Sequence, residues 1–234
     1  MANSRRGFVP KDEVEFNIDK LALLKKAQQD ILYLLEQGYP VKGASTFVGN
    51  HFMLSECQRL AVVRATANSE MIDLRRIKEL KQEQLGERVA IDGLNIIITL
   101  EVALSQGTLI KCMDGTIRDL AGLRGTYRLI EETNTAISFI GEHLAKFKIQ
   151  EVLFYLDAPV SNTGRLKSLI YKQLEGYPYK VSVELVNNPD IILESSENVI
   201  SSDSIILNKC SSWYNLVAYI LQEKLPDIRI VDMS

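Results

Sequence analysis

The sequence is poor in the residues that build zinc sites and disulfide scaffolds. Its 234 residues include three cysteines (Cys57, Cys112 and Cys210) and two histidines (His51 and His143). A structural zinc site needs about four clustered Cys or His ligands, and none of these residues stands at such a spacing from another. An odd cysteine count also argues against a disulfide-rich secreted domain. We therefore expect no zinc finger and predict a reducing, cytoplasmic setting in which the thiols fill core positions.

Long apolar runs and a strong net charge are also missing. No stretch of about 18 apolar residues is free of charges, so we expect no membrane span. Arg5 and Arg6 are followed by Pro10-Lys11-Asp12-Glu13 instead of an apolar segment, so we expect no secretory signal. The net charge is only −3, which disfavours broad, non-specific binding to nucleic acid. Apolar residues make up 46% of the chain, which excludes disorder as its main character.

The first 85 residues have the pattern of a helical module. Apolar residues recur at helical spacing after Ile18, and Ser55 with Gln58 forms a capping-box pattern that predicts the start of a helix. Ser69 is the expected cap of the last helix, which is highly charged. We predict helices over 18–37, 41–48, 56–67 and 70–84, and a domain of residues 1–85.

From residue 86 onward the pattern changes to strands that alternate with helices. The predicted strands are short and apolar, which is typical of a parallel sheet covered on both faces. We therefore predict an α/β domain over residues 86–234. Its expected strands cover 88–92, 151–157, 181–186, 198–202 and 227–231, with helices over 95–105, 120–147, 165–174 and 213–224 and a short extended piece near 108–113.

Three of these predicted strands are followed by or end in aspartate: Asp92, Asp157 and Asp203. The carboxyl ends of parallel strands share one edge of a sheet, so the three carboxylates are expected to lie close together. Clustered carboxylates repel one another and favour a cation, and oxygen ligands suit Mg²⁺ or Mn²⁺. The chemistry typical of such a site is phosphodiester hydrolysis. The alternative is that each aspartate only caps the helix after its strand.

Residues 88–234 resemble a PIN-like domain of the broad group that includes the NYN nucleases. The resemblance is carried by Asp92-Gly-Leu-Asn95 after the first strand, by Ser201-Ser-Asp203-Ser-Ile-Ile after the fourth, and by the count of five strands. It implies a five-stranded parallel sheet of order 3-2-1-4-5 flanked by helices. It also implies that Asp92 and Asp203 are metal ligands, that Asn95 orients a phosphate or ligand, and that Asp157 matches the second-strand aspartate of the NYN branch.

The whole chain also resembles an uncharacterised prokaryotic family that joins a helical module to this PIN-like domain. Gly38-Tyr39-Pro40-Val41-Lys42 and Leu54-Ser55-Glu56-Cys57-Gln58-Arg59-Leu60 carry that resemblance. Many PIN nucleases have a further acidic residue, and this sequence leaves its identity open. The candidates are Asp114, Asp119, Glu131, Glu132 and Asp190.

Basic residues flank the predicted carboxylates. Arg124 and Arg128 are four residues apart and would share one face of the helix predicted over 120–147. With Arg118 they predict a stripe that holds phosphate oxygens, and the alternative is a set of internal ion pairs. Ser161 and Arg165 follow Asp157 and are expected at a helix start that could also receive an anion.

Together these patterns predict a Mg²⁺- or Mn²⁺-dependent ribonuclease with catalytic and metal-binding residues Asp92, Asp157 and Asp203. The predicted substrate-binding residues are Asn95, Arg118, Arg124, Arg128, Ser161 and Arg165. Two alternatives are left open: a non-catalytic RNA- or protein-binding module with a degenerate site, and a nucleotide phosphohydrolase. RNA is the expected partner, and the helical module is a candidate for homodimer formation.

Overall fold

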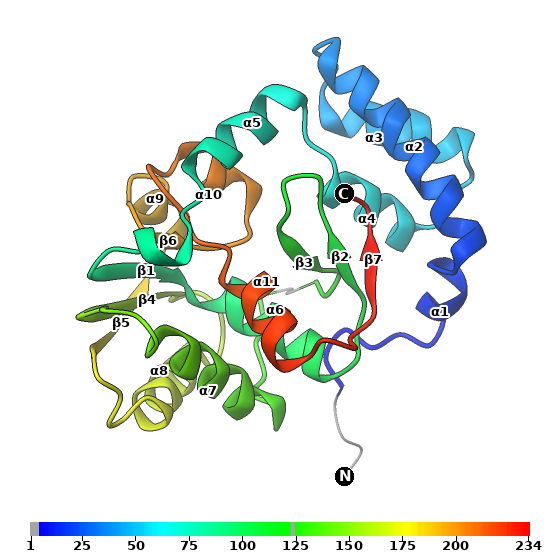
Figure 1. Ribbon diagram of the computed structural model, residues 1–234. Coiled ribbons are helices and arrows are strands. Elements are labelled where there is room, and N and C mark those ends of the chain that lie inside the picture. The colour runs from blue at the N-terminus through cyan, green and yellow to red at the C-terminus, as the bar shows by residue number, and fades with distance from the viewer. Residues whose placement is uncertain (1–4, 123–124) are drawn as a thin grey trace.

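The computed structural model describes residues 5–122 and 125–234 (Figure 1). Its N-terminal part is helical, as predicted. Helix α2 is capped by the Asn17 side chain and α4 by a Ser55–Gln58 capping box, which confirms that sequence signal. The elements are α1 (Asp12–Glu15), α2 (Ile18–Glu36), α3 (Val41–His51), α4 (Glu56–Ala65), α5 (Ser69–Lys78) and the 3-10 helix η1 (Gln82–Gln84).

The helix predicted over 70–84 is shorter than expected. Asn68, and not Ser69, caps α5, and the helix ends at Lys78. The chain then runs beside Trp213: the amide of Trp213 donates to the Lys78 carbonyl at 3.0 Å, and the amide of Leu80 donates to the Trp213 carbonyl at 2.7 Å. These backbone bonds replace the helical bonds, which explains why a charged, helix-forming sequence leaves the helix there.

The main sheet, sheet A, is parallel and has the order β5-β4-β1-β6. Counted along the predicted strands, that order is 3-2-1-4. Its strands are β1 (Arg88–Asp92), β4 (Glu151–Asp157), β5 (Lys180–Val186) and β6 (Val199–Ile200). The first two have the predicted bounds, and β4 is almost entirely buried.

The fifth predicted strand does not join this sheet, so the predicted five-stranded order 3-2-1-4-5 is wrong. Strand β7 (Ile230–Asp232) pairs instead with β2 (Leu109–Lys111), which pairs with β3 (Ile117–Asp119) in sheet B. The segment around Trp213 occupies the outer edge of β6. Trp213 forms a β-bridge with Val199, and the Tyr214 amide donates to the Val199 carbonyl at 2.8 Å.

Helix α6 (Gly93–Leu104) is buried along most of its length and lies in the main core. The helix predicted over 120–147 is confirmed only as α7 (Glu132–Leu144), because residues 125–131 are not helical. Gly125 has φ +72°, which favours glycine and breaks a helix, and Tyr127 turns inward to a fully buried position. The remaining helices are α8 (Thr163–Gln173), α9 (Pro189–Leu193), α10 (Ser204–Lys209) and α11 (Leu216–Lys224).

Sheet B lies between sheet A and helices α1 to α4 (Figure 1). Ile110 of β2 and Val231 of β7 pack with Leu24 and Ile31 of α2 in a second core. The Gln28 side chain donates to the carbonyl of Met233 at 2.8 Å. The helical part and the C-terminal strand therefore share one core. Among the described residues, no helix combines the length and the apolarity that crossing a membrane requires.

Candidate functional site

A pocket of about 570 Å³ opens at the carboxyl ends of β1 and β4. It brings together five of the residues predicted as site residues: Asp92, Asn95, Arg118, Asp157 and Asp203. The same pocket is lined by Arg64 and Arg75 from the helical part and by Asp119 from β3. Its apolar lining includes Val63, Leu94, Ile98, Ala121 and Val160.

Asp92 ends β1 and sits at the start of α6, where its side chain is buried. The hydroxyl of Ser201 donates to Oδ2 of Asp92 at 2.8 Å. Burial raises the pKa of the Asp92 carboxyl to about 7, and the nearby charges of Asp203 and Asp190 add to that rise, while the Ser201 hydrogen bond opposes it. Asp92 is thus a buried carboxyl among like charges, with too few donors to hold its negative charge.

Asp203 lies three residues after β6 and caps α10, accepting hydrogen bonds from the amides of Ile205 and Ile206 at 2.7 and 3.3 Å. The capping alternative is therefore met for this aspartate. Asn95 fixes the same turn: its Oδ1 accepts from the amide and the hydroxyl of Ser202, both at 2.9 Å. The Asn95 oxygen is engaged with protein, so its role here is to hold the β6–α10 turn against α6.

Asp157 ends β4 beside β1 and is half-buried, and this burial raises its pKa. Asp190, in the first turn of α9, is close enough to contribute to the same electrostatic group. Burial and then the charges of Asp203 and Asp157 raise the pKa of Asp190. Four carboxylates therefore influence one another at this edge of the sheet.

Asp92, Asp157 and Asp203 share a pocket without forming a compact ligand cluster. Within the described ranges, one group of three Asp, Glu, Cys or His residues has its ligand atoms all within 4.8 Å of one another, and it lies elsewhere, at Asp12, Glu15 and Cys57. The oxygens of Asp92, Asp157 and Asp203 are therefore farther apart. They could surround a hydrated ion, but they do not form a closed cage.

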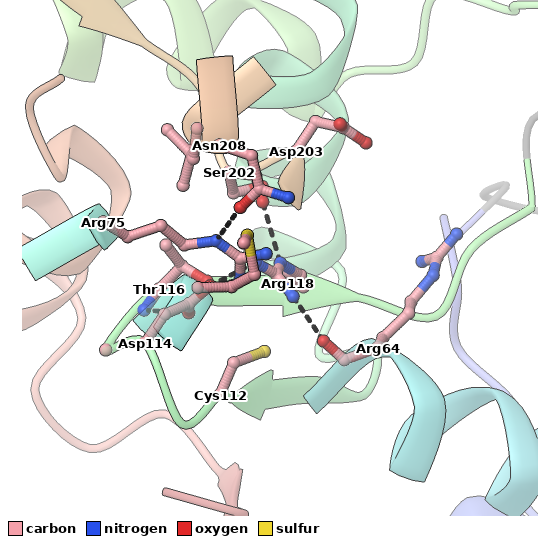
Figure 2. A network of polar contacts seen from close by, with 12 residues as sticks. Arg64, Arg75, Cys112, Asp114, Thr116, Arg118, Ser202, Asp203 and Asn208 are labelled. Carbon is pink, nitrogen blue, oxygen red and sulfur yellow. Dashed lines mark hydrogen bonds and ion pairs between the residues drawn. The ribbon is translucent and has the colours of Figure 1, made fainter. Parts of the chain in front are cut away.

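A buried ion-pair network forms one wall of the pocket (Figure 2). Oδ2 of Asp114 accepts from Arg75 Nη1 at 2.6 Å and from Arg118 Nη2 at 2.5 Å. Its Oδ1 accepts from the Thr116 hydroxyl at 2.6 Å and the Thr116 amide at 3.1 Å. Burial alone would raise the pKa of Asp114, but Arg118, Thr116 and Arg75 outweigh it and hold that pKa below its usual value.

Arg118 is a structural arginine in this arrangement. Its Nε donates to the Ser202 carbonyl at 2.7 Å, its Nη1 donates to the Arg64 carbonyl, and its Nη2 is bound to Asp114. Three of its five N–H groups are thus committed to the protein. The predicted role of Arg118 as a phosphate ligand gives way to the alternative of an internal ion pair, which also ties α4 to the Ser202 turn.

Arg128, Ser161 and Arg165 lie outside the pocket lining. Arg128 is exposed in the non-helical segment after Gly125, so the prediction that it lies on a helix face is wrong; Arg124 lies outside the described residues. Ser161 and Arg165 are exposed at the start of α8, which Asn162 precedes with φ +66° and no side-chain cap. The loop there is fixed by Asn162 Nδ2, which donates to the Tyr127 carbonyl at 2.7 Å.

Of the five candidates for the additional acidic residue, two lie close to the other carboxylates. Asp119 lines the pocket, where the Thr99 hydroxyl donates to its Oδ2 at 2.9 Å, and Asp190 lies within electrostatic reach of the other carboxylates. Asp114 is committed to the two arginines. Glu131 and Glu132 lie at the start of α7, outside the pocket lining.

A family model described as "Domain of unknown function (DUF5616)" matches residues 81–219, more than half of the chain. The chain belongs to this family. A second model, "Protein of unknown function (DUF434)", matches residues 23–78. An uncharacterised protein of Methanocaldococcus jannaschii is 36% identical over 186 residues, which cover 79% of this chain and 88% of that relative. No solved structure matches the chain.

The pocket draws on both matched regions. Asp92, Asn95, Arg118, Asp157 and Asp203 lie in the DUF5616 region, whereas Val63, Arg64, Thr66 and Arg75 lie in the DUF434 region. Sequence reasoning missed the second set. Arg64 and Arg75 are ordinary charged residues near helix ends, and only the packing of α4 and α5 against sheet B and α10 reveals their place.

Proposed function

We propose that this DUF5616 protein is a Mg²⁺- or Mn²⁺-dependent ribonuclease. The observation that carries the proposal is the placement of Asp92, Asp157 and Asp203 in one pocket at the carboxyl edge of adjacent parallel strands. Ligand sites of open α/β sheets lie at this edge. The resemblance of Asp92-Gly-Leu-Asn95 and Ser201-Ser-Asp203-Ser to PIN-like motifs supports the choice of phosphodiester hydrolysis.

The donor set fits a hard divalent cation. It offers carboxylate oxygens, and the raised pKa of the buried Asp92 marks negative charge that nearby donors do not fully compensate. Mg²⁺ usually keeps several waters and uses one or two protein carboxylates, so a compact three-carboxylate cage is not required. When bound, the ion would activate a water and stabilise the leaving oxygen. Asp92, Asp157 and Asp203 would hold it, and Ser201 and Asn95 would position Asp92 and the Asp203 turn.

The setting is proposed to be the cytoplasm, because all three cysteines are free thiols, as a reducing compartment would keep them. A homodimer through the helical part stays a prediction. RNA is the proposed substrate.

The first prediction concerns Asp92→Asn, which removes one carboxylate charge without changing side-chain size. We expect cleavage of single-stranded RNA in Mg²⁺ or Mn²⁺ to fall by about two to three orders of magnitude, because a metal site supplies several kcal/mol of transition-state stabilisation. Calorimetric titration with Mn²⁺ should show weaker binding in parallel. The matched control is Asp30→Asn, on the exposed face of α2, which should leave both measurements unchanged.

Equal cleavage by Asp92→Asn and the wild type, or no cleavage by the wild type with either metal, would rule out the ribonuclease. Measurements of Mn²⁺ binding, RNA binding and mononucleotide hydrolysis then distinguish the two alternative functions. RNA binding without Mn²⁺ binding indicates the degenerate binding module, and hydrolysis confined to mononucleotides indicates the phosphohydrolase.

A further inference from the structure

The helical N-terminal part forms a wall of the pocket and contributes positively charged arginine side chains to it. We propose that Arg64 binds a backbone phosphate of single-stranded RNA, so that the DUF434 region completes the substrate site of the DUF5616 region. The inference rests on the proposed function for its substrate class. It assigns a substrate-binding role to a residue that the strand-end motifs do not include.

Of the three arginines that line the pocket, Arg64 keeps the most donors available. The side chain of Arg75 is 4% exposed, with Nε bound to Asn208 Oδ1 at 2.7 Å and Nη1 bound to Asp114. Arg118 has three of its N–H groups committed. The Arg64 side chain is 35% exposed, and its hydrogen bond within the described residues runs from Nη1 to the Asp119 carbonyl. Figure 2 shows its guanidinium extending away from the Arg75–Asp114–Arg118 network.

Arg64 is also held in place, which lowers the entropic cost of binding. It lies in the last turn of α4, and its backbone carbonyl accepts from Arg118 Nη1. Its Nη1 lies 3.8 Å from Asp119 Oδ1. The protein therefore anchors the backbone of Arg64 and its Nη1, and among the described residues no hydrogen bond holds its Nε or Nη2.

The charges of the pocket favour a phosphate at Arg64. Without the proposed cation, Asp92, Asp157 and Asp203 make the sheet edge acidic and would repel a phosphodiester from that side. On the opposite wall, Asp114 and Asp119 balance the charges of Arg75 and Arg118, so the net positive charge of that wall is the one that Arg64 adds. Arginine is well suited to phosphate oxygens because its N–H groups form a fixed fork.

The shape of the site favours a single strand. The carboxylates lie inside a concavity between the helical part and the edge of sheet A. One flexible backbone can enter such a pocket and place a phosphate at Arg64, whereas a duplex would have to bring its second strand with it. The apolar lining, with Val63, Ile98 and Val160, provides a surface for an unpaired base.

The experiment measures binding of a fluorescein-labelled oligouridylate by fluorescence anisotropy over a range of salt concentrations, with Ca²⁺ in place of Mg²⁺ to prevent cleavage. Arg64→Gln should weaken binding by about 10-fold, the effect of one lost hydrogen-bonded ion contact. It should lower the slope of log affinity against log salt by about 0.7, the value for one phosphate contact on a single strand. Arg64→Lys should restore the slope and only part of the affinity.

The matched control is Arg76→Gln, which removes the same charge from α5. Its side chain is 62% exposed, pairs with Asp73 and lies outside the pocket lining. Arg76→Gln should bind RNA like the wild type, and thermal melting should show that both variants are folded. Wild-type affinity and slope in Arg64→Gln, or equal losses in the Arg64 and Arg76 variants, would overturn the proposal, as would absence of RNA binding by the wild type. The Asp92-dependent Mn²⁺ titration reports on the metal site separately, so the two proposals can fail independently.

Discussion

Asp92 and Asp114 show how environment sets the behaviour of one residue type. Both are buried, yet burial raises the pKa of Asp92 to about 7, whereas the charges of Arg118 and Arg75 and the Thr116 donors hold the pKa of Asp114 below its usual value. Both oxygens of Asp114 accept hydrogen bonds, from Arg75, Arg118 and Thr116, and these bonds hold the pocket wall together. The donors to Asp92 are neutral, the Ser201 hydroxyl and the Asn95 backbone amide, and carboxylates lie around it, so its negative charge has no cationic partner comparable to those of Asp114. Asp114 thus has a structural role, whereas Asp92 has the environment that the proposed metal site requires.

Asp114→Asn tests the structural half of this distinction. The variant leaves two buried guanidinium groups without their common carboxylate, and breaking such a pair costs about 3–5 kcal/mol of unfolding free energy. Because the folded pKa of Asp114 lies below its ordinary value of 3.8, its contribution is present above that pH and is lost as the pH falls through the folded value. Urea unfolding at neutral pH is therefore the measurement.

The control for Asp114→Asn is Asp73→Asn, which breaks the exposed pair with Arg76 at 3.7 Å. A surface pair of this kind contributes about 0–1 kcal/mol. If the two variants lose similar, small amounts of stability, Asp114 is not the centre of the pocket wall.

Among the helices and strands, those with local signals were predictable. Ser55 and Gln58 are three residues apart in the sequence, and both hydrogen bonds of their capping box are present. The apolar runs that form β1 and β4 end at Asp92 and Asp157, because the chain must leave the sheet edge where polar side chains begin. The grouping of Asp92 and Asp157 in one pocket followed from that edge.

Elements fixed by distant partners were not predictable. The segment before α7 has helical composition, yet it is extended at Thr126, which bridges Ser161, and its Tyr127 hydroxyl donates to the buried Glu101 at 2.6 Å. Strand β7 joins sheet B because Trp213 already covers the edge of β6. Arg118 has a local partner in Asp114, four residues earlier, but its other acceptors are the carbonyls of Ser202 and Arg64, 84 and 54 residues away. Each of these positions depends on which edges and surfaces stay uncovered once sheet A has formed.

Helix α4 carries Arg64, so its capping box contributes to the position of the pocket wall. Ser55→Ala removes the side-chain acceptor of the Gln58 amide, which lies at 3.2 Å. Loss of an N-cap of this type costs about 1 kcal/mol. Urea unfolding should show this loss. As a control, Ser168→Ala in the interior of α8 should change stability by less than about 0.5 kcal/mol, because alanine is the better helix former there. An equal effect of both variants would contradict the role of the cap.

At the scale of the whole molecule, the boundary predicted near residue 85 crosses a continuous network of contacts. The second core joins Leu24 and Ala61 of the helices to Ile110 and Val231 of sheet B. A second contact across the boundary is the hydrogen bond from the indole N–H of Trp213 to the carbonyl of Arg75 at 2.8 Å, which attaches α5 to the edge of sheet A. The pocket lies between these two attachments. Its geometry therefore depends on the helical part remaining docked.

This arrangement predicts that the chain unfolds as one cooperative unit. Leu24 is fully buried in the second core, and Leu24→Ala should cost about 2–5 kcal/mol through the cavity it creates. The single tryptophan, Trp213, lies outside that core, in a cluster with Leu153 and Val199 of sheet A. If unfolding is cooperative, Leu24→Ala lowers the urea midpoint of Trp213 fluorescence and of far-ultraviolet circular dichroism by the same amount, since coincident probes indicate two-state behaviour. A fluorescence midpoint that stays at the wild-type value while the dichroism splits into two transitions would show that the helices unfold separately. Substrate binding at Arg64 would then require a docking step before the pocket is complete.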